Sequence, residues 1–255
     1  MDRQGWYKAG VGGNQDEILY KHMINHAGGL PGMYDDMVHL IAPRSQHNSS
    51  ALLLMAAYGD EFLDSQYVNG GDGDLFKLEG IYYPTTTIDG TPQGLKVPVY
   101  PGDGVLFMDF LNLGTDQEPY RWCYYKENNQ AGDRWDQMMA VAKMFSLTGT
   151  AIDAPSQKLL DVNEWCRAFA IESLFGNGDT YGHDNLHNFA VYFRPEDGKA
   201  LAFPWDMDVS FNLPTSAPLL PNANVAKVVT LPANQRLFYS HLYDLVTTTY
   251  NRAYM

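Results

Sequence analysis

The sequence has few cysteines, few basic residues and no long apolar run, and each shortage excludes a class of protein. Two cysteines in 255 residues are too few for a disulfide-rich scaffold. Lysine and arginine number 17 against 30 acidic residues, and the net charge of −13 argues against a nucleic-acid-binding surface, which needs a basic stripe. No apolar run reaches the length of a membrane span, and Met1 to Gly5 show no signal-peptide pattern.

The remaining composition is that of a globular protein. Hydrophobic residues make up 45% of the chain and charged residues 18%, so one sizeable core is expected, in one large domain or in two lobes. Cys166 lies on the apolar side of a predicted helix, and a buried free thiol there is favoured over a disulfide with Cys123. The acidity does not exclude a nucleotide site, because a bound metal ion can reverse the local field.

Carboxylates and amides are concentrated in one glycine-rich stretch, residues 175–188. A helix is predicted before it, since Asp161 and Glu164 have the spacing of a capping box and an apolar stripe follows as far as Gly176. A polar loop that follows such a helix and precedes a strand is typical of a catalytic site.

Two strands are predicted after this loop, over residues 188–193 and 200–205. They are joined by a turn at residues 195–198, whose Asp-Gly pair suits positive φ. The hairpin would return the segment 204–208 to the edge of the glycine-rich loop.

Three carboxylates and an amide are therefore expected on one rim, namely Asp179, Asn188, Asp206 and Asp208. Hard oxygen ligands of this kind suit Mg²⁺ that holds the phosphates of a nucleotide. Asp206 and Asp208 are two residues apart, so a continued strand would point both the same way, one binding metal and the other bracing it.

A family pattern runs through these segments. It is carried by Gly176-Asn177-x-Asp179, by His187-Asn188-Phe189 and by Pro204-Trp205-Asp206-x-Asp208-x-Ser210-Phe211, and more weakly by Gly29-Leu30-Pro31 and Gly73-Asp74-Leu75-Phe76-Lys77. Together these segments resemble the CotH kinase family, spore-coat protein H and its relatives, which are atypical protein kinases. The loop and the Trp-Asp-x-Asp segment together are fairly specific, and the resemblance covers most of the chain.

The resemblance implies an α+β fold of the two-lobed kinase type, in a single domain over residues 1–255. Residues 1–80 would form a remnant N-lobe and a hinge-like region, residues 81–129 an excursion, and residues 130–255 a mostly helical C-lobe with the catalytic loop and the metal-binding hairpin. The strands that should open an N-lobe are not evident, and the chain ends soon after its last predicted helix. The sequence is therefore interpreted as a family fragment with an incomplete N-lobe, truncated at both ends.

The resemblance also implies ATP- and Mg²⁺-dependent transfer of phosphate to serine or threonine hydroxyls of a protein, driven mainly by positioning and charge neutralisation. Asp179 would orient or deprotonate the acceptor hydroxyl. The step from Asp179 to Asn188 is longer than in typical kinase loops, which makes Asp184 a rival for that role. Asn188 and Asp206 would hold Mg²⁺, and Asp208 would be a second metal contact or a brace.

Three further positions bear on nucleotide binding. Lys77, on a predicted strand, could reach a phosphate, although a surface lysine is the ordinary case. Glu17 lies in a predicted helix, residues 14–27, that would take the place of the helix flanking the phosphate site. It could pair with a missing lysine, or it could cap the helix together with Asn14. The family's usual glutamate after the second early strand is absent, since Met55-Ala56-Ala57 stands there.

Other elements are predicted from periodicity. Strands are expected over residues 37–42 and 51–58, the second almost wholly apolar and so buried on both faces. Residues 69–74 lack the closing glutamate of a calcium loop and are interpreted as a solvated hairpin turn. Long loops are predicted over residues 84–117 and 214–232. The first, a middle and the last helix should bury the stripes Ile18, Leu19, Met23 and Ala27; Trp135, Met138, Met139, Ala142 and Phe145; and Phe238, Leu242, Leu245 and Thr249.

Two other functions compete with the kinase interpretation. A pseudokinase-like binding or structural module of a coat or cell-surface layer is favoured by Ala56 and the missing N-lobe strands, whereas the acidic cluster favours the enzyme. His183 and His187 have the spacing of a zinc pair on a helix, but Gly182 and Asn185 favour a loop there, so zinc hydrolysis is a distant third. Relatives act in spore coats or outside the cytoplasm, so a coat or surface protein is the implied substrate.

Overall fold

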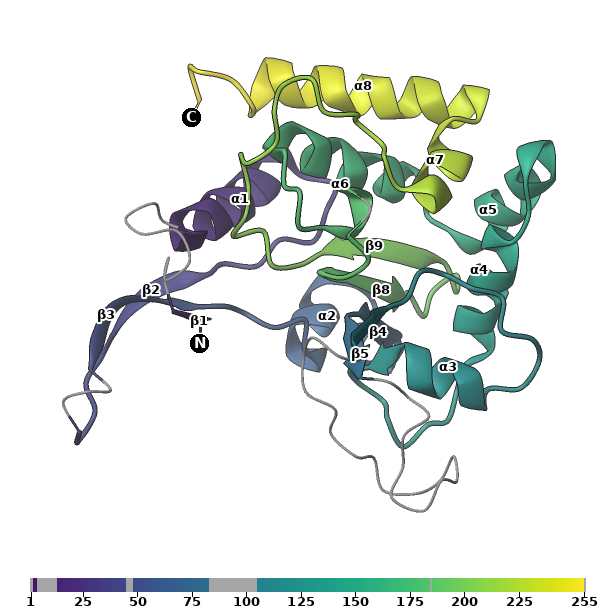
Figure 1. The fold of residues 1–255 in the computed structure, drawn as a ribbon, viewed down its shortest axis with the longest axis horizontal. Helices are drawn as coiled ribbons and strands as arrows, with labels where there is room; N and C mark the ends of the chain where they lie inside the picture. Colours follow the sequence, from purple (N-terminus) through teal and green to yellow (C-terminus); the bar gives the residue numbers. More distant parts are fainter. Residues whose placement is uncertain (1, 4–12, 45–47, 83–104, 184, 255) are drawn as a thin grey trace.

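The computed structural model of this chain describes residues 2–3, 13–44, 48–82, 105–183 and 185–254 (Figure 1). In chain order the elements are β1 (Asp2–Arg3), α1 (Gly13–Ala27), β2 (Asp36–Leu40), β3 (Ser49–Leu54), α2 (Asp60–Gln66), η2 (Gly70–Asp72), β4 (Asp74–Leu78), β5 (Gly80–Tyr82), β6 (Val105–Phe107), α3 (Glu118–Cys123), β7 (Tyr125–Lys126), α4 (Asp136–Phe145), η3 (Gly149–Ile152), α5 (Asp153–Leu159), α6 (Val162–Phe175), η4 (Tyr181–His183), β8 (Phe189–Phe193), β9 (Ala200–Pro204), α7 (Ala223–Val229) and α8 (Pro232–Thr248). The predicted α+β class is confirmed.

A four-stranded antiparallel sheet lies at the centre, in the order β7-β4-β8-β9. Its last two strands form the predicted hairpin, paired without interruption from Phe189 opposite Pro204 to Phe193 opposite Ala200. Gly198 has a φ of +69° in the turn, as its position after Asp197 predicted. The ends of the hairpin therefore fix where the segments 176–188 and 205–208 meet.

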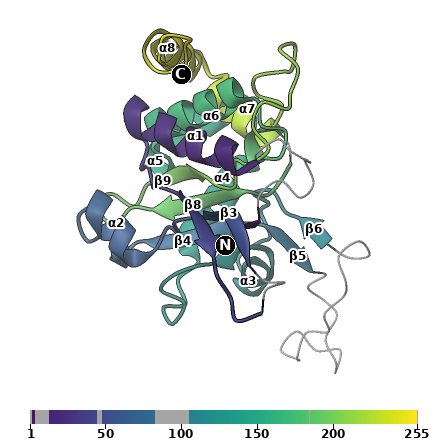
Figure 2. The same cartoon turned by 90° about the vertical axis from the view of Figure 1, so that its left-hand side faces the viewer.

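Helices cover one side of this sheet in two layers (Figure 2). α6 lies next to it and contacts β9, and α8 packs on α6 as the outermost helix, whereas α3 lies on the other side of the sheet. α8 confirms the predicted last amphipathic helix, and its Phe238 and Leu245 are 1% and 2% exposed. The core below the glycine-rich loop is aromatic, with Tyr181 and Phe189 stacked at a centroid distance of 4.7 Å.

A second, smaller sheet has the order β1-β3-β2, and its β2–β3 hairpin projects from the body of the molecule (Figure 1). The strand predicted over 51–58 ends at Leu54, whose side chain is 46% exposed, while the adjacent Leu53 is fully buried. The prediction that this strand is buried on both faces is therefore wrong, because no segment in the described part of the chain covers the side chain of Leu54.

α6 confirms its predicted ends but only half of its predicted cap. Asp161 is the N-cap and accepts the N–H of Glu164 at 3.3 Å, and Gly176 ends the helix in the left-handed conformation. The Glu164 carboxylate does not return to Asp161. It accepts the N–H of Ala202 in β9 at 2.8 Å, and so joins the helix to the sheet.

The buried face of α1 differs from the predicted stripe. Met23 is buried as expected, but Ile18 is only partly buried, while Glu17 and Lys21 are among the least exposed residues of the helix. The apolar periodicity missed this face because two of its residues carry charges. Glu17 is buried against another segment, so its interpretation as a capping residue is wrong.

Several local predictions were tested in the remaining described segments. α4 buries Met138, Ala142 and Phe145 as predicted. Residues 69–74 form a short 3-10 turn that leads from α2 into β4 rather than a hairpin turn. The loop predicted over 214–232 contains a helix, α7, whose N-cap Asn222 accepts two backbone N–H groups.

Both cysteines are buried free thiols, as expected for Cys166. No helix in the described part of the chain combines the length and the apolar character needed to cross a membrane. Residues 83–104, which belong to the predicted excursion, and Asp184 lie outside the described residues.

Candidate active site

The glycine-rich loop leaves α6 at Gly176 and is tied at once to the chain beyond Asp208. Phe211 donates its N–H to Phe175 O at 2.6 Å, and Leu213 donates to Gly176 O at 3.1 Å. Asn212 accepts the N–H of Gly178 at 2.9 Å through its side-chain oxygen. These bonds hold the start of the loop against the segment that follows the second strand of the hairpin.

A buried carboxyl group fixes the middle of the loop from below. Glu172, in the last turn of α6, is 1% exposed, and its Oε2 accepts the Thr180 hydroxyl at 3.3 Å and a backbone hydrogen bond from Gly182. A Cβ on Gly182 would stand 2.1 Å from that oxygen, so only glycine fits there. Burial raises the pKa of Glu172 to about 8, so the group is mostly neutral at pH 7.

Asp179 lies at the surface end of this loop with its carboxylate held by neighbours. Its backbone N–H donates to Asn177 Oδ1 at 2.8 Å, the Asn185 amide donates to its Oδ1, and His187 Nε2 lies 3.3 Å from the same oxygen. The hydrogen bond from His187, with that residue's charge and the bond from Asn185, lowers the pKa of Asp179 although burial opposes it. The side chain is 36% exposed, so an ionised carboxylate faces an open side.

Asn188 stands directly beside Asp179. Its Nδ2 donates to Asp179 O at 2.8 Å and to Asp179 Oδ2 at 3.5 Å, which leaves the amide oxygen as the atom able to bind a cation. Its backbone has a φ of +55°, and its carbonyl accepts the N–H of Trp205 at 3.1 Å. The structure therefore joins the predicted base and the predicted amide ligand to the end of β9.

The pKa of His187 depends on the other charges near this rim. Its own burial lowers the pKa, but the hydrogen bond to Asp179 and the charges of Asp179, Glu79 and Asp206 outweigh it and raise the pKa. Asp206 is thus close enough to the loop to act on its histidine, as predicted. Glu79 was missed by sequence reasoning. In the sequence, the signal for Glu79 was its place directly after the strand that carries Lys77. In the structure, burial raises the pKa of Glu79.

The segment after β9 turns instead of continuing as a strand. β9 ends at Pro204, Asp206 has a φ of +53°, and a turn follows in which Ser210 donates its hydroxyl to Met207 O at 2.7 Å. The strand alternation that would have pointed Asp206 and Asp208 the same way is therefore lost. Asp208 is 5% exposed within the turn.

Lys77 lies in β4, opposite Ala190 of β8, and close to the rim. Its Nζ is 3.1 Å from Glu127 Oε1 and 4.5 Å from the centre of the Trp205 ring. The side chain is 18% exposed. It is therefore a partly buried, paired lysine rather than an ordinary surface one.

The donor chemistry of the rim suits a hard cation. Asn188 has an amide oxygen, and Asp206 and Asp208 are carboxylates on either side of Met207 in the chain. Within the described ranges, however, no three histidine, cysteine, aspartate or glutamate side chains are gathered closely enough to hold a metal by themselves. Mg²⁺ commonly takes one or two protein carboxylates and completes its shell with water and substrate phosphates, so this donor set fits Mg²⁺ better than a metal held wholly by protein.

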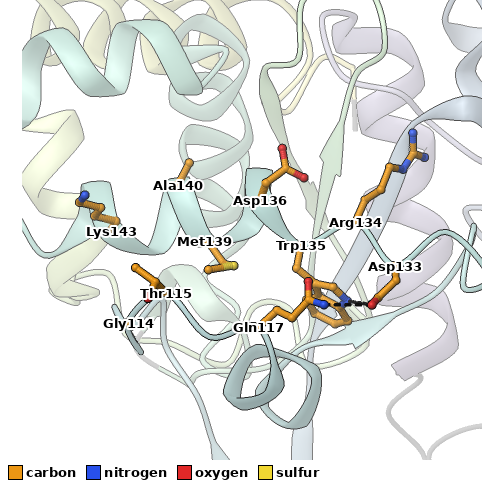
Figure 3. Close-up of a pocket in the computed structure, with 10 residues that line it drawn as sticks. All are labelled: Gly114, Thr115, Gln117, Asp133, Arg134, Trp135, Asp136, Met139, Ala140 and Lys143. Carbon is orange, nitrogen blue, oxygen red and sulfur yellow. Dashed lines mark hydrogen bonds between the residues drawn. The ribbon is translucent and has the colours of Figure 1, made fainter.

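Figure 3 shows a hollow in another part of the structure, at α4 and the segment before it. It has a volume of about 420 Å³, and its walls come from Gly114, Thr115 and Gln117, from residues 133–135 and from one face of α4. Asp133 accepts hydrogen bonds there from Gln117 and Trp135, each at 3.0 Å. None of the predicted site residues lines it, so the polar loop and turn, not this hollow, form the candidate site.

A comparison with known protein families gave a match over most of the chain. A family model described as CotH kinase protein matches residues 53–243, which is more than half of the chain and includes the loop, the hairpin and the turn. The weaker Gly29-Leu30-Pro31 similarity falls before the matched residues. A comparison with curated proteins gave no match.

Proposed function

The chain belongs to the CotH kinase family, and from that premise we propose that it transfers phosphate from ATP, with Mg²⁺, to serine or threonine hydroxyls of a protein. The observation that supports this most directly is the contact of Asn188 with both the backbone and the carboxylate of Asp179, beside the turn that holds Asp206. The residues proposed as base, amide ligand and carboxylate ligand therefore lie near one another at one edge of the sheet.

Asp179 is the proposed base or orienting group. Its lowered pKa keeps the carboxylate ionised at neutral pH, and its partly open side chain can accept the proton of an incoming hydroxyl. In the transfer, the acceptor oxygen bonds to the terminal phosphorus, the bond to ADP breaks, and the hydroxyl proton passes to Asp179 or to solvent. His187, cationic over a wider pH range because its pKa is raised, balances part of the negative charge at this point.

Asn188 and Asp206 are the proposed Mg²⁺ ligands, with Asp208 as a second contact or a brace, and Lys77 the proposed phosphate contact. Bound there, Mg²⁺ would neutralise the charge of the nucleotide phosphates. The chain's own contribution is to hold these oxygens in place. The bond from Trp205 N–H to Asn188 O fixes the distance between the two segments that supply them.

Calorimetric titration of ATP, with and without Mg²⁺, tests this proposal. We expect Mg²⁺-dependent binding that Asp206→Ala weakens about 100-fold or more, because a direct ligand is removed. Asp153→Ala is the matched control. Asp153 is an exposed acidic residue at the start of α5, and it takes part in none of the contacts described for the loop. Unchanged binding by Asp206→Ala would contradict the metal assignment.

A second measurement separates the base from the metal ligands. Asp179→Asn should keep Mg²⁺-dependent ATP binding within about threefold and lower kcat about 100-fold or more, measured by transfer of labelled phosphate to protein serine or threonine. If Asp179→Asn transfers phosphate at the wild-type rate, Asp179 is not the base. Asp184→Asn is then the variant to measure.

The alternative function is a pseudokinase-like binding or structural module of a coat or cell-surface layer. Two contacts favour it: His187 occupies the carboxylate of Asp179, and Glu127 occupies the ammonium of Lys77. The Lys77 pair would have to open for the proposed phosphate contact, and an incoming hydroxyl would have to compete with His187 for the Asp179 carboxylate. Wild-type protein that binds neither ATP nor Mg²⁺ would make this module the better proposal.

A further inference from the structure

α1 buries two opposite charges on the face that it turns to the rest of the molecule. Glu17 and Lys21 are one helical turn apart, and their side chains are 0% and 2% exposed. Lys21 Nζ lies 3.4 Å from Glu17 Oε1. A buried pair of this kind forms only where further contacts compensate for the loss of hydration, so the next question is what else these side chains touch.

Glu17 makes a second contact with the candidate site. Its Oε2 accepts the backbone N–H of Met207, the residue between Asp206 and Asp208, while its other oxygen faces Lys21. One carboxylate therefore bridges an ammonium group in α1 and the backbone of the proposed metal-binding turn.

Contacts from the same cluster hold the chain on both sides of Asp206. The Tyr58 hydroxyl donates to Pro204 O at 2.9 Å, and Lys21 Nζ lies 5.4 Å from the Trp205 ring and 5.5 Å from the Tyr58 ring. The backbone is thus fixed at residue 204 by Tyr58 and at residue 207 by Glu17. Asp206, between these points, has a left-handed φ that a non-glycine residue keeps only where its surroundings impose it.

The other end of α1 is fixed as well. Arg167 of α6 donates its Nε to Gly28 O at 2.5 Å and an NH2 group to Ala27 O, and its NH1 lies 2.9 Å from Asp244 of α8. These bonds satisfy carbonyl groups that the helix leaves free at its C-terminus. α1 is therefore anchored at its last turn, and Glu17 is held at a set distance from Met207.

We propose that Glu17, oriented by Lys21, is a positioning residue that holds Asp206 and Asp208 in place through the N–H of Met207. The inference rests on the proposed function in one respect, namely that this turn binds Mg²⁺. It adds that the lysine partner of Glu17 comes from α1 itself, and that the pair contacts the proposed metal-binding turn through the backbone of Met207. A pair that served only to stabilise the fold would be replaceable by apolar side chains without a local effect on this turn.

The test compares a variant that loses the acceptor with one that keeps it. Glu17→Leu with Lys21→Met replaces the pair by apolar groups of similar volume, an exchange that folded proteins often tolerate. Glu17→Gln keeps an oxygen that can accept the Met207 N–H. Lys126→Met is the matched control, because Lys126 is also a buried lysine, 3.1 Å from the carboxylate of Asp74, and that carboxylate keeps Arg134 as a partner.

Two readouts are measured on each protein: hydrogen exchange of the Met207 amide without nucleotide or metal, and the Kd for Mn²⁺ in the presence of ADP. We expect the double variant to exchange Met207 about tenfold faster or more and to bind Mn²⁺ about tenfold more weakly, with exchange at Val191 in β8 unchanged. Glu17→Gln and Lys126→Met should stay within about threefold of wild type at both readouts.

The outcomes distinguish this inference from the proposed function. Unchanged Met207 exchange in the folded double variant overturns the positioning role, whatever the metal result. Wild-type Mn²⁺ affinity in a double variant whose Met207 exchange is accelerated overturns the link to metal. If wild-type protein itself binds no Mn²⁺, the proposed function fails and with it that link, while exchange still decides whether Glu17 holds Met207. If the double variant does not fold, Glu17→Ala is measured in its place, with the same expectations.

Discussion

Two antiparallel hairpins of similar length differ in how they are buried. Every residue of β8 and β9 is buried, whereas every residue of β2 is exposed or only partly buried and β3 ends at the half-exposed Leu54. The β8–β9 hairpin divides two hydrophobic clusters, with Phe189 and Val191 in one and Ala190 and Tyr192 in the other. A hairpin packed on both faces can hold loop residues at fixed distances, and the candidate site lies at the ends of this one.

The register of the two hairpins shows the same contrast. Pairing in β8–β9 is continuous over five residue pairs, while that of β2–β3 shifts between Val38 and Leu40. A one-residue slip in β8–β9 would move apolar side chains from one cluster to the other, so burial on both sides specifies the register strongly. The β2–β3 hairpin has less to specify it.

The largest expected difference between the two hairpins is the loss of stability when a side chain is truncated. Phe189→Ala removes a ring that stacks on Tyr181 at 4.7 Å and lies 5.8 Å from Trp165, so we expect a loss of about 4 kcal/mol in the free energy of unfolding. Urea unfolding measures it. Ile41→Ala, at a side chain that is 78% exposed, is the control and should change stability by less than about 0.5 kcal/mol. Similar losses at both positions would remove the contrast.

The next expected effect is a pH dependence of stability that arises from Glu172, beneath the loop that precedes β8. Glu172 has a folded pKa of about 8, above the value of 4.5 that it has when solvated, so it stabilises the fold fully below pH 4.5. That contribution is lost progressively between pH 4.5 and 8, because over this range the unfolded chain ionises while the buried carboxyl keeps its proton. Glu172→Gln should therefore gain stability relative to wild type, by several kcal/mol, as pH rises from 4.5 to 8.

Thermal or urea unfolding at several pH values measures this difference. Glu196→Gln, in the exposed turn between β8 and β9, should show no such trend relative to wild type. A Glu172→Gln profile parallel to that of wild type would mean that the carboxyl is already ionised in the folded protein.

A smaller effect is expected from adding one methyl group under the loop. Gly182→Ala places a Cβ 2.1 Å from Glu172 Oε2 and should cost about 2 kcal/mol, since the loop must move to admit it. Catalytic activity should fall as well, because the same loop carries Asp179. Gly132→Ala is the control, as its added Cβ would meet its nearest neighbour at 3.4 Å. Equal stability of the two variants would show that the loop is not fixed by Glu172.

Local signals predicted most of the region around the site. The Asp-Gly turn, the apolar strands and the glycine after α6 predicted the loop, the hairpin and their meeting point, because each signal acts between residues close in sequence. The structure shows that Asp179 and Asn188 are in contact and that Asp206 is near enough to raise the pKa of His187.

The missed features depend on partners distant in sequence. Glu17 looked like a cap because the Met207 N–H that it accepts is 190 residues away. Glu172 looked like one more residue of a helix, since the bond to Thr180 and the space taken at Gly182 appear only after the loop folds back. Strand β3 looked fully buried because composition cannot show whether a second layer covers it.

The last comparison tests the burial of β3 within one strand. Leu53 and Leu54 are neighbours in β3 that point to opposite faces, and they are 0% and 46% exposed. Leu53→Ala should lose about 3 kcal/mol of unfolding free energy, whereas Leu54→Ala should lose less than about 0.5 kcal/mol. Urea unfolding of both variants measures the difference. Equal large losses would mean that something covers the outer face of the β2–β3 hairpin and that this hairpin, like β8–β9, is packed on both sides.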